Sequence, residues 1–356
     1  MDPASLIPAA DALPVHWPLL QFLLTLTTFL HLIAMNVLLG GGVLAFVSSL
    51  SRQEADRLLS RGLAGVLPYL LAFTINFGVA PLLFLQTLYG QFFYTSTVLM
   101  AVYWLAIVGL LIIAYYGAYL FLLKFDDLRH LRPFVIGLVC LLLLVISFFF
   151  TNNISIMQMV ESWPGYFANR NGWLVNGADP TLLPRYLHFV LSGIAVGSLA
   201  VALFFEYRRR HGDTAADRCI TLGCRWFAVT TGLNFGVGFW FLGTLPPAAH
   251  DTSTPAGILF AVTLYGSVAS GALSIIRAMT GRVRSAALWT LITVFFMVVA
   301  RDMVRIASLS PFLSLSELPV VAQYSPFLVF CLLFIAIGLL VRWMVRLVWR
   351  MEEVRS

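Results

Sequence analysis

Apolar residues along this chain come in long runs that are separated by short polar connections. Nine runs approach or exceed the roughly 20 residues that a helix needs to cross the hydrocarbon core of a bilayer. They cover approximately residues 19–50, 62–88, 97–123, 133–152, 184–207, 221–245, 256–276, 286–308 and 325–347. The runs do not alternate between apolar and polar positions, as the strands of a membrane β-barrel would. Because lipid offers a bare backbone no hydrogen bonds, the pattern predicts an all-α integral membrane protein with about nine transmembrane helices.

Composition supports this prediction. Of the 356 residues, 60% are hydrophobic and only 11% are charged. A soluble domain of this length would need more charged residues to cover its surface.

The basic residues predict an orientation. They follow the first, third, fifth, seventh and ninth runs: Arg52, Arg57 and Arg61; Lys124, Arg129 and Arg132; Arg208, Arg209, Arg210 and Arg218; Arg277, Arg282 and Arg284; Arg342, Arg346, Arg350 and Arg355. The other connections, 1–16, 89–96, 153–183 and 246–255, are almost free of Lys and Arg. Since cytoplasmic loops carry the excess of Lys and Arg, the N-terminus is expected outside and the C-terminus inside. The net charge of +6 is then an orientation signal and gives no reason to expect a nucleic-acid partner.

Two stretches of the chain resemble one another. Leu30-His31 recurs as Leu187-His188 at an offset of 157 residues (188 − 31), and Gly40 maps onto Gly197 at the same offset. The segment 76–79, Asn-Phe-Gly-Val, recurs at 234–237. Chance similarity between short apolar segments is the alternative to a true repeat.

A repeat of this length predicts two parallel four-helix units. The first would cover residues 19–152 and the second 184–308, joined by an outer loop over 153–183. An outer segment over 1–18 would precede them, and a C-terminal helix with a cytoplasmic tail would follow over 309–356.

Two of the six histidines, His31 and His188, lie inside predicted spans. Ionisable residues within a membrane usually face the interior of the bundle and mark a site. A neutral imidazole in a helical bundle is a common axial ligand of haem iron. The alternative for either histidine is a hydrogen bond to a neighbouring helix.

Three arginines, Arg185, Arg301 and Arg305, are expected near the outer ends of their spans, where they oppose the charge bias. They therefore need anionic partners, and the propionates of a haem would serve through charge-assisted hydrogen bonds. Pairing with acidic side chains is the alternative, and the candidates are Asp302, Glu317 and Glu161. Further iron ligands near the outer surface could come from Met303, Met157, Met159 or Asp302.

Several of these segments resemble subunit I of the cytochrome bd quinol oxidases. The similarity covers roughly residues 19–245 and rests on these segments: Leu20-Gln21-Phe22 through His31 to Gly40; Ile75-Asn76-Phe77; and, in the outer loop, Asn153, Met157-Gln158, Gly165, Asn171-Gly172, Asp179-Pro180 and Arg185-Tyr186-Leu187-His188. The resemblance implies nine spans in a bacterial inner membrane, b haems held by His31 and His188, quinol as a partner, and a companion membrane subunit.

The chain also departs from that family. Gln86 stands where the family has a glutamate close to a haem, and the acids of the third span are absent. The long quinol-binding loop is reduced to about residues 246–255, and the methionine of the seventh span finds only apolar neighbours around Leu264. Asp302 and Arg305 match the glutamate and arginine of the eighth span only in part.

Retained histidines and missing carboxylates together favour electron transfer over oxygen reduction. The sequence therefore predicts a subunit with two or more b haems that passes electrons between membrane quinol or quinone and a periplasmic partner such as a c-type cytochrome. A bd-type terminal oxidase and a haem-free transporter or membrane anchor remain as alternatives.

Overall fold

The structure is a computed structural model that describes residues 2–51, 53–168, 170–211 and 216–355, without the side chains of 55 and 348–355. The arginines expected to be cytoplasmic at positions 52, 350 and 355 lie outside the described side chains. Within the described part, nine long α-helices carry the fold: α1 (Trp17–Leu50), α2 (Glu54–Leu99), α3 (Ala101–Leu123), α5 (Arg132–Gln158), α6 (Leu182–Arg210), α7 (Ala216–Thr244), α8 (Pro255–Met279), α9 (Val283–Leu309) and α10 (Tyr324–Arg355). The short helix α4 (Phe125–Leu128) and four 3₁₀ segments lie between them, and a fifth 3₁₀ segment (Pro3–Leu6) precedes α1.

The prediction of an all-α membrane protein is confirmed. Eight of these helices are long and apolar enough to cross a bilayer, which makes the chain a multi-pass membrane protein. The exception among the described helices is α7, the expected sixth span. Its glycines, threonines and Asn234 lower its mean hydropathy, yet it packs extensively on α6 and leaves its other face, with Val229, Leu233 and Phe239, exposed at the surface of the bundle.

The connection expected over 89–96 is instead helical. Helix α2 continues through it to Leu99, with a kink at Tyr89 where the backbone leaves the helical region (φ −132°, ψ 30°). Beyond the kink, Phe92 and Phe93 are buried and join a cluster with Trp163 of the outer loop. Burial of these aromatic side chains explains why the segment stays helical although it follows the predicted span.

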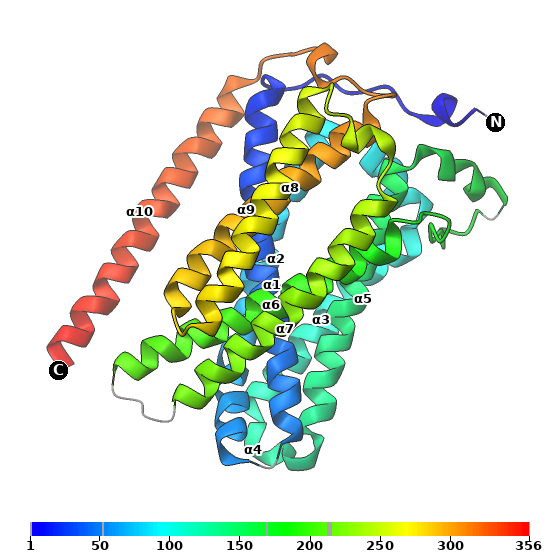
Figure 1. Cartoon of the computed structure of the whole chain (residues 1–356). Coiled ribbons are helices and arrows are strands. Elements are labelled where there is room, and N and C mark those ends of the chain that lie inside the picture. Colours follow the sequence, from blue (N-terminus) through cyan, green and yellow to red (C-terminus); the bar gives the residue numbers. More distant parts are fainter. Residues whose placement is uncertain (1, 52, 169, 212–215, 356) are drawn as a thin grey trace.

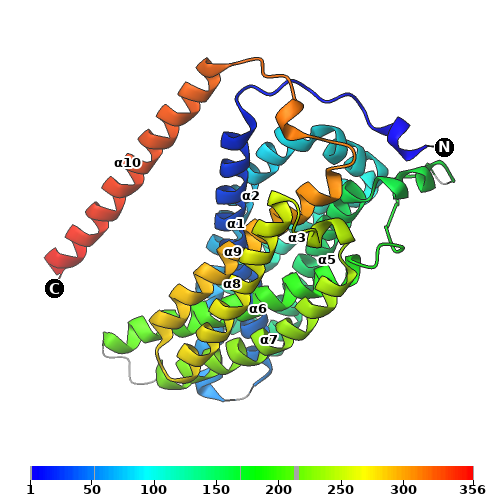
Figure 2. The same cartoon turned by 45° about the horizontal axis from the view of Figure 1, so that its top comes forward.

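Helix α1 is the central helix of the bundle, packing against α2, α5, α6 and α9. Three antiparallel pairs, α1–α2, α6–α7 and α8–α9, make the most extensive contacts, and α3 packs on α5 (Figure 1). Helix α10 stands away from the others in both views (Figures 1 and 2), and none of its side chains from 324 to 347 is buried. The segment before α10 is held by backbone hydrogen bonds of Leu13, which donates to Pro319 (2.8 Å) and accepts from Val321 (2.9 Å).

Helices α1 and α6 touch backbone to backbone. A Cβ atom added at Gly40 would lie 2.5 Å from the carbonyl oxygen of Gly193 and 2.7 Å from the Cα of Gly197. A Cβ atom at Gly197 would lie 2.5 Å from the Cα of Gly40. Only glycine permits such an approach, and small residues commonly provide it between membrane helices. Gly40 and Gly197 are the two glycines that the predicted repeat makes equivalent, and the repeat itself stays a prediction.

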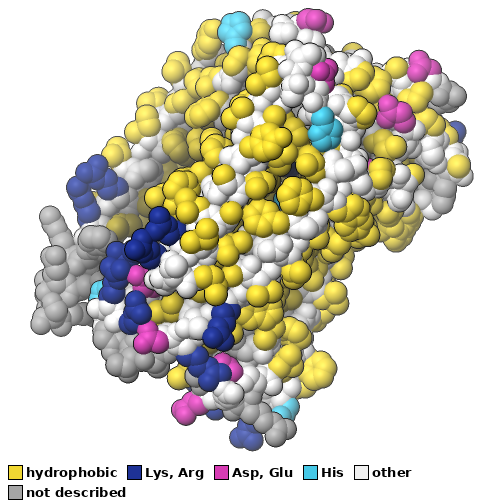
Figure 3. All heavy atoms as spheres, in the orientation of Figure 1, with side chains coloured by type: hydrophobic (Ala, Val, Ile, Leu, Met, Phe, Trp, Pro, Cys, Tyr) yellow, Lys and Arg dark blue, Asp and Glu magenta, His cyan; other side chains and the backbone are white. Residues whose placement is uncertain are grey.

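The basic side chains gather at the end of the bundle where the α6–α7 and α8–α9 connections lie (Figures 1 and 3). This distribution is the one from which the sequence predicts the cytoplasmic side, and the orientation stays a prediction. We call this end the basic end, and the end that carries the outer loop the opposite end.

Candidate functional site

The start of α6 is fixed by a buried aspartate. Asp179 accepts hydrogen bonds from the backbone nitrogen and the hydroxyl of Thr181 (2.8 and 2.9 Å) and from the hydroxyl of Ser155 on α5 (2.5 Å). These bonds bind the first turn of α6 to the end of α5. Arg185 and His188 follow on that first part of the helix, so their positions depend on this anchor.

The rest of the outer loop is fixed by buried asparagines. Asn152 accepts a hydrogen bond from the backbone of Asn176 (2.9 Å) and donates one to the carbonyl of Leu174 (3.0 Å), while Asn153 donates to Ser96 (3.1 Å). Gly172 has a φ of +73°, which an L side chain rarely adopts. The bonds of Asn152, with the backbone bonds of Gly172 to Val102 and of Leu174 to Leu99, hold the loop against the ends of α2, α3 and α5.

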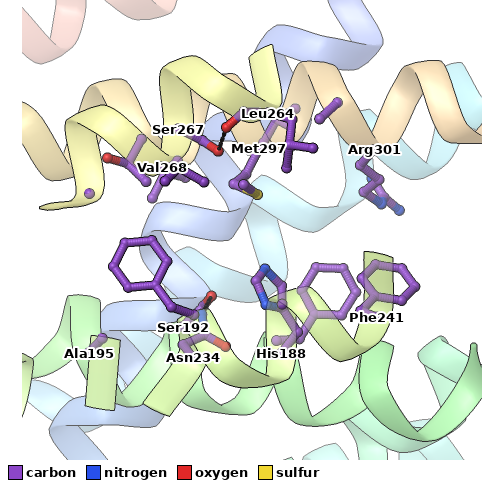
Figure 4. Close-up of a pocket in the computed structure, with 18 of the residues that line it drawn as sticks. His188, Ser192, Ala195, Asn234, Phe241, Leu264, Ser267, Val268, Met297 and Arg301 are labelled. Atoms are coloured by element: carbon purple, nitrogen blue, oxygen red, sulfur yellow. Dashed lines mark hydrogen bonds between the residues drawn. The ribbon is translucent and has the colours of Figure 1, made fainter. Parts of the chain in front are cut away.

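His188 projects from α6 into a space between two helical pairs, α6–α7 on one side and α8–α9 on the other (Figure 4). Its ring lies against Gly238 of α7, where an added Cβ would be 3.3 Å from both Cε1 and Nδ1. Nδ1 is buried near the backbone of Asn234 without a hydrogen bond of normal geometry. The lack of a side chain at Gly238 leaves room for the imidazole at this point.

The space itself, which we call the inter-hairpin cavity, amounts to about 1570 Å³ including the part that opens to the surface. Most of its lining is apolar, and its only charged lining residues among those described are Arg185 and Arg301. Phe239 lines the cavity and is 59% exposed, so the cavity reaches the lipid-facing surface at α7.

Neither arginine forms an ion pair with an acidic side chain within the described residues, and Asp179 and Asp302 act on Arg185 and Arg301 only from a greater distance. Arg185 is only 6% exposed, its guanidinium lies 5.5 Å from the ring centroid of Phe241, and its Nη1 is buried without a hydrogen bond. Arg301 enters the cavity from α9, and no ion pair is found for it within the described residues (Figure 4). Gln158 also lines this part of the cavity, with a buried Oε1 that has no partner. An unpaired buried cation is costly, so this end of the cavity suits an anionic group.

Met297 of α9 was not predicted from the sequence. Its side chain points into the inter-hairpin cavity from the wall opposite His188 (Figure 4). No local signal marks it, since methionine in an apolar span is usually a packing residue. Met297 lies four residues, or about one helical turn, before Arg301, so both side chains enter the cavity from one face of α9.

Asp302 and Arg305 pair with each other away from the cavity. Arg305 Nη2 lies 2.7 Å from Asp302 Oδ1, and the other carboxylate oxygen accepts hydrogen bonds from Gln21 (3.1 Å) and Thr25 (2.5 Å) of α1. The guanidinium also lies 4.8 Å from the ring centroid of Tyr89 at the kink of α2. Internal pairing, one of the two alternatives considered for the outer arginines, is thus found for Arg305. The network joins α1, α2 and α9. Both oxygens of the Asp302 carboxylate have hydrogen-bond partners in it.

His31 lies on α1 against α2. Its Nδ1 is 3.1 Å from the carbonyl of Thr74, and a Cβ added at Gly78 would approach the ring to 3.0 Å. A carbonyl oxygen only accepts, so Nδ1 carries the proton and Nε2 keeps its lone pair. In a metal-binding histidine, one ring nitrogen usually donates to a backbone carbonyl and the other ring nitrogen is free to bind the metal. His31 does not line the inter-hairpin cavity.

The other predicted site residues lie elsewhere. Gln86 is half-buried on α2, and Met303 packs with the apolar cluster of Leu245 and Phe260. Met157 is buried under the outer loop, and Met159 accepts a weak hydrogen bond from Asn176. The structure therefore brings together His188, Arg185 and Arg301, and not the remaining candidates.

The residues around the cavity fit a haem. His188 and Met297 would hold the iron through a ring nitrogen and a thioether sulfur, and His with Met is a known pair of protein ligands for haem iron. The unpartnered Arg185 and Arg301 would face the propionates, and the apolar walls would surround the macrocycle.

Comparison of the sequence with protein families and with curated proteins finds no match. Comparison of the fold with solved structures finds the bd oxidase from Geobacillus thermodenitrificans, with a TM-score of 0.70 and 13% sequence identity over 92% of this chain and 96% of that chain. The chain therefore has a bd oxidase-like helical membrane fold.

Proposed function

We propose that this chain is a haem b-binding electron-transfer subunit of a membrane respiratory complex. It would exchange electrons between quinol or quinone in the bilayer and a partner on the outer face, such as a periplasmic c-type cytochrome. The observation that carries the proposal is the inter-hairpin cavity, where His188 and Met297 face one another beside two unpaired arginines. The fold that the chain shares with a bd oxidase supports it. Haem b, when bound, supplies a one-electron redox centre, and the protein supplies ligation and electrostatics.

Two b haems are proposed, one at His188 and one at His31. Arg185 and Arg301 would hold the propionates of the first and raise its reduction potential, since positive charge disfavours the oxidised iron. The hydrogen bond from His31 Nδ1 to Thr74 would orient the ring for the second.

A pyridine haemochrome assay on the purified protein tests the proposal. We expect b haem in the wild type, and the loss of one haem per chain in each of His31→Ala and His188→Ala. His130→Ala, which changes a histidine of the α3–α5 connection, is the matched control and should keep the full content. A wild-type protein without a Soret band would instead support the haem-free transporter or anchor.

A bd-type terminal oxidase is the second candidate, because the similar solved structure is a bd oxidase. Oxygen consumption with quinol separates the two functions. We expect none from the purified chain, and quinol-dependent consumption that disappears in His31→Ala would favour the oxidase.

A further inference from the structure

The inter-hairpin cavity is longer than the part that His188, Met297 and the arginines occupy. On α9 its lining continues from Met297 to Thr290, seven residues nearer the basic end. At 1.5 Å per residue this adds roughly 10 Å of cavity. We call this part, between Met297 and Thr290, the inner chamber.

The inner chamber has a different chemistry from the outer part. None of its described lining residues is charged, and two polar atoms of α7 in it are buried without partners: Thr231 Oγ1 and Asn234 Oδ1. These residues are three apart and so lie on one face of the helix. Phe227 and Phe235 provide aromatic lining beside them. Buried polar atoms without partners cost free energy, which a ligand with matching groups would recover.

These features exclude several occupants. A second haem would need an axial nitrogen or sulfur, and the inner chamber offers no histidine, cysteine or methionine beyond Met297. An ion would meet no opposite charge. A lipid tail would leave the two polar atoms unpaired.

A neutral ring with oxygen substituents meets each requirement. We propose that the inner chamber binds the ring of a quinone or quinol, with hydrogen bonds to Thr231 and Asn234 and the ring packed against the phenylalanines. The hydroxyl of Thr231 can donate to a quinone oxygen or accept from a quinol, and Asn234 Oδ1 can accept from a quinol. Asn234 Nδ2 donates to Ser192 (2.9 Å), which holds the amide in place.

The ring could reach the chamber from the bilayer. Phe239 marks the place where the cavity opens to the lipid-facing surface, two turns from Thr231 along α7. A quinone carries an apolar tail that stays in lipid, so a lateral opening suits it better than one at either end. The site would lie beside the haem at His188, so the bound quinone or quinol would exchange electrons with that haem. This inference therefore rests on the proposed function.

Quinone binding to the purified full chain in nanodiscs tests the proposal, with decylubiquinone and menadione as probes and quenching of tryptophan fluorescence as the readout. We expect Asn234→Leu and Thr231→Val to weaken binding of the better probe about tenfold, equivalent to the loss of one hydrogen bond. Val268→Phe, which places a larger side chain in the cavity, should weaken it further. Asn76→Leu is the matched control, because Asn76 is exposed and its amide bonds only to Ala72. It should bind as the wild type does.

Haem content, measured on the same samples, separates the two proposals. Wild-type haem content with unchanged quinone affinity in Asn234→Leu, Thr231→Val and Val268→Phe would overturn the inner-chamber site and leave the haem function standing. A chain without haem whose quinone affinity falls in these variants as expected would overturn the haem function and leave the inner-chamber site standing. A lipid as the natural occupant would give unchanged quinone affinity in all three variants and so also overturns the site.

Discussion

The contact between Gly40 and Gly197 gives the sharpest test of how the bundle is assembled. In Gly40→Ala the new Cβ would lie 2.5 Å from the carbonyl oxygen of Gly193, whereas ordinary contacts begin at about 3.4 Å. Helices α1 and α6 must then separate by 3.4 − 2.5, or about 0.9 Å. The neighbouring atoms are backbone and cannot turn aside as a flexible side chain could.

The expected cost follows from two opposing terms. Overpacking of a tight interface typically costs about 1 to 3 kcal/mol. Replacing glycine by alanine within a helix returns up to about 1 kcal/mol. Gly109→Ala on α3 provides the matched control, because its Cβ would meet nothing within 4 Å and only the favourable term applies. We expect Gly40→Ala to be about 1 to 3 kcal/mol less stable than Gly109→Ala.

Thermal unfolding of the purified variants in the same detergent, followed by circular dichroism, measures the difference. The midpoint of Gly40→Ala should fall below that of the wild type, and the midpoint of Gly109→Ala should stay level or rise. Equal midpoints for the two variants would refute the backbone contact. A loss of haem in Gly40→Ala should accompany the lower midpoint, since α6 carries both Gly197 and His188.

Three further predictions concern α9. Met297→Leu should keep the haem at His188 but change its spectrum from low spin to high spin, whereas Met303→Leu should not; identical spectra would remove Met297 as a ligand. Arg301→Gln should lower the midpoint potential of the haem in a redox titration by about 70 mV. A unit charge at about 10 Å and an effective dielectric of about 20 contributes about 1.7 kcal/mol, and an unchanged potential would show that Arg301 does not lie near the haem. Asp302→Leu alone should cost about 3 to 5 kcal/mol in unfolding experiments, and the double change with Arg305→Leu should cost less than the sum of the two single changes. Additive costs would contradict the ion pair.

Much of the fold could be predicted because its signal is local. A run of apolar residues long enough to span a bilayer is a helix whatever its neighbours are, and all nine runs proved helical. The prediction of helix ends failed where contacts between distant parts of the chain decide the local structure. The segment around Phe92 stays helical because the outer loop covers it, and a window of sequence does not reveal that cover.

The site divides in the same way. His188 is conspicuous because an imidazole within an apolar run is rare, whereas Met297 becomes distinctive only when α9 faces α6 across the cavity. The spacing of Asp302 and Arg305 by three residues did hint at their pair, since such residues are neighbours on a helix. The sequence also indicated that Arg185 and Arg301 need an anionic partner, but it did not tell them from Arg305, which pairs with Asp302.

The cavity between two helical pairs also has a consequence for the synthesis of the protein. His188 and Met297 are 109 residues apart (297 − 188), so ribosomes adding about 5 to 20 residues per second make the second wall about 5 to 20 s after the first. During that interval α6 and α7 present His188 to the lipid with nothing opposite it. For the proposed haem, insertion would be open from the side until α8 and α9 enter the membrane, and their arrival would close the pocket and bring Met297 opposite His188.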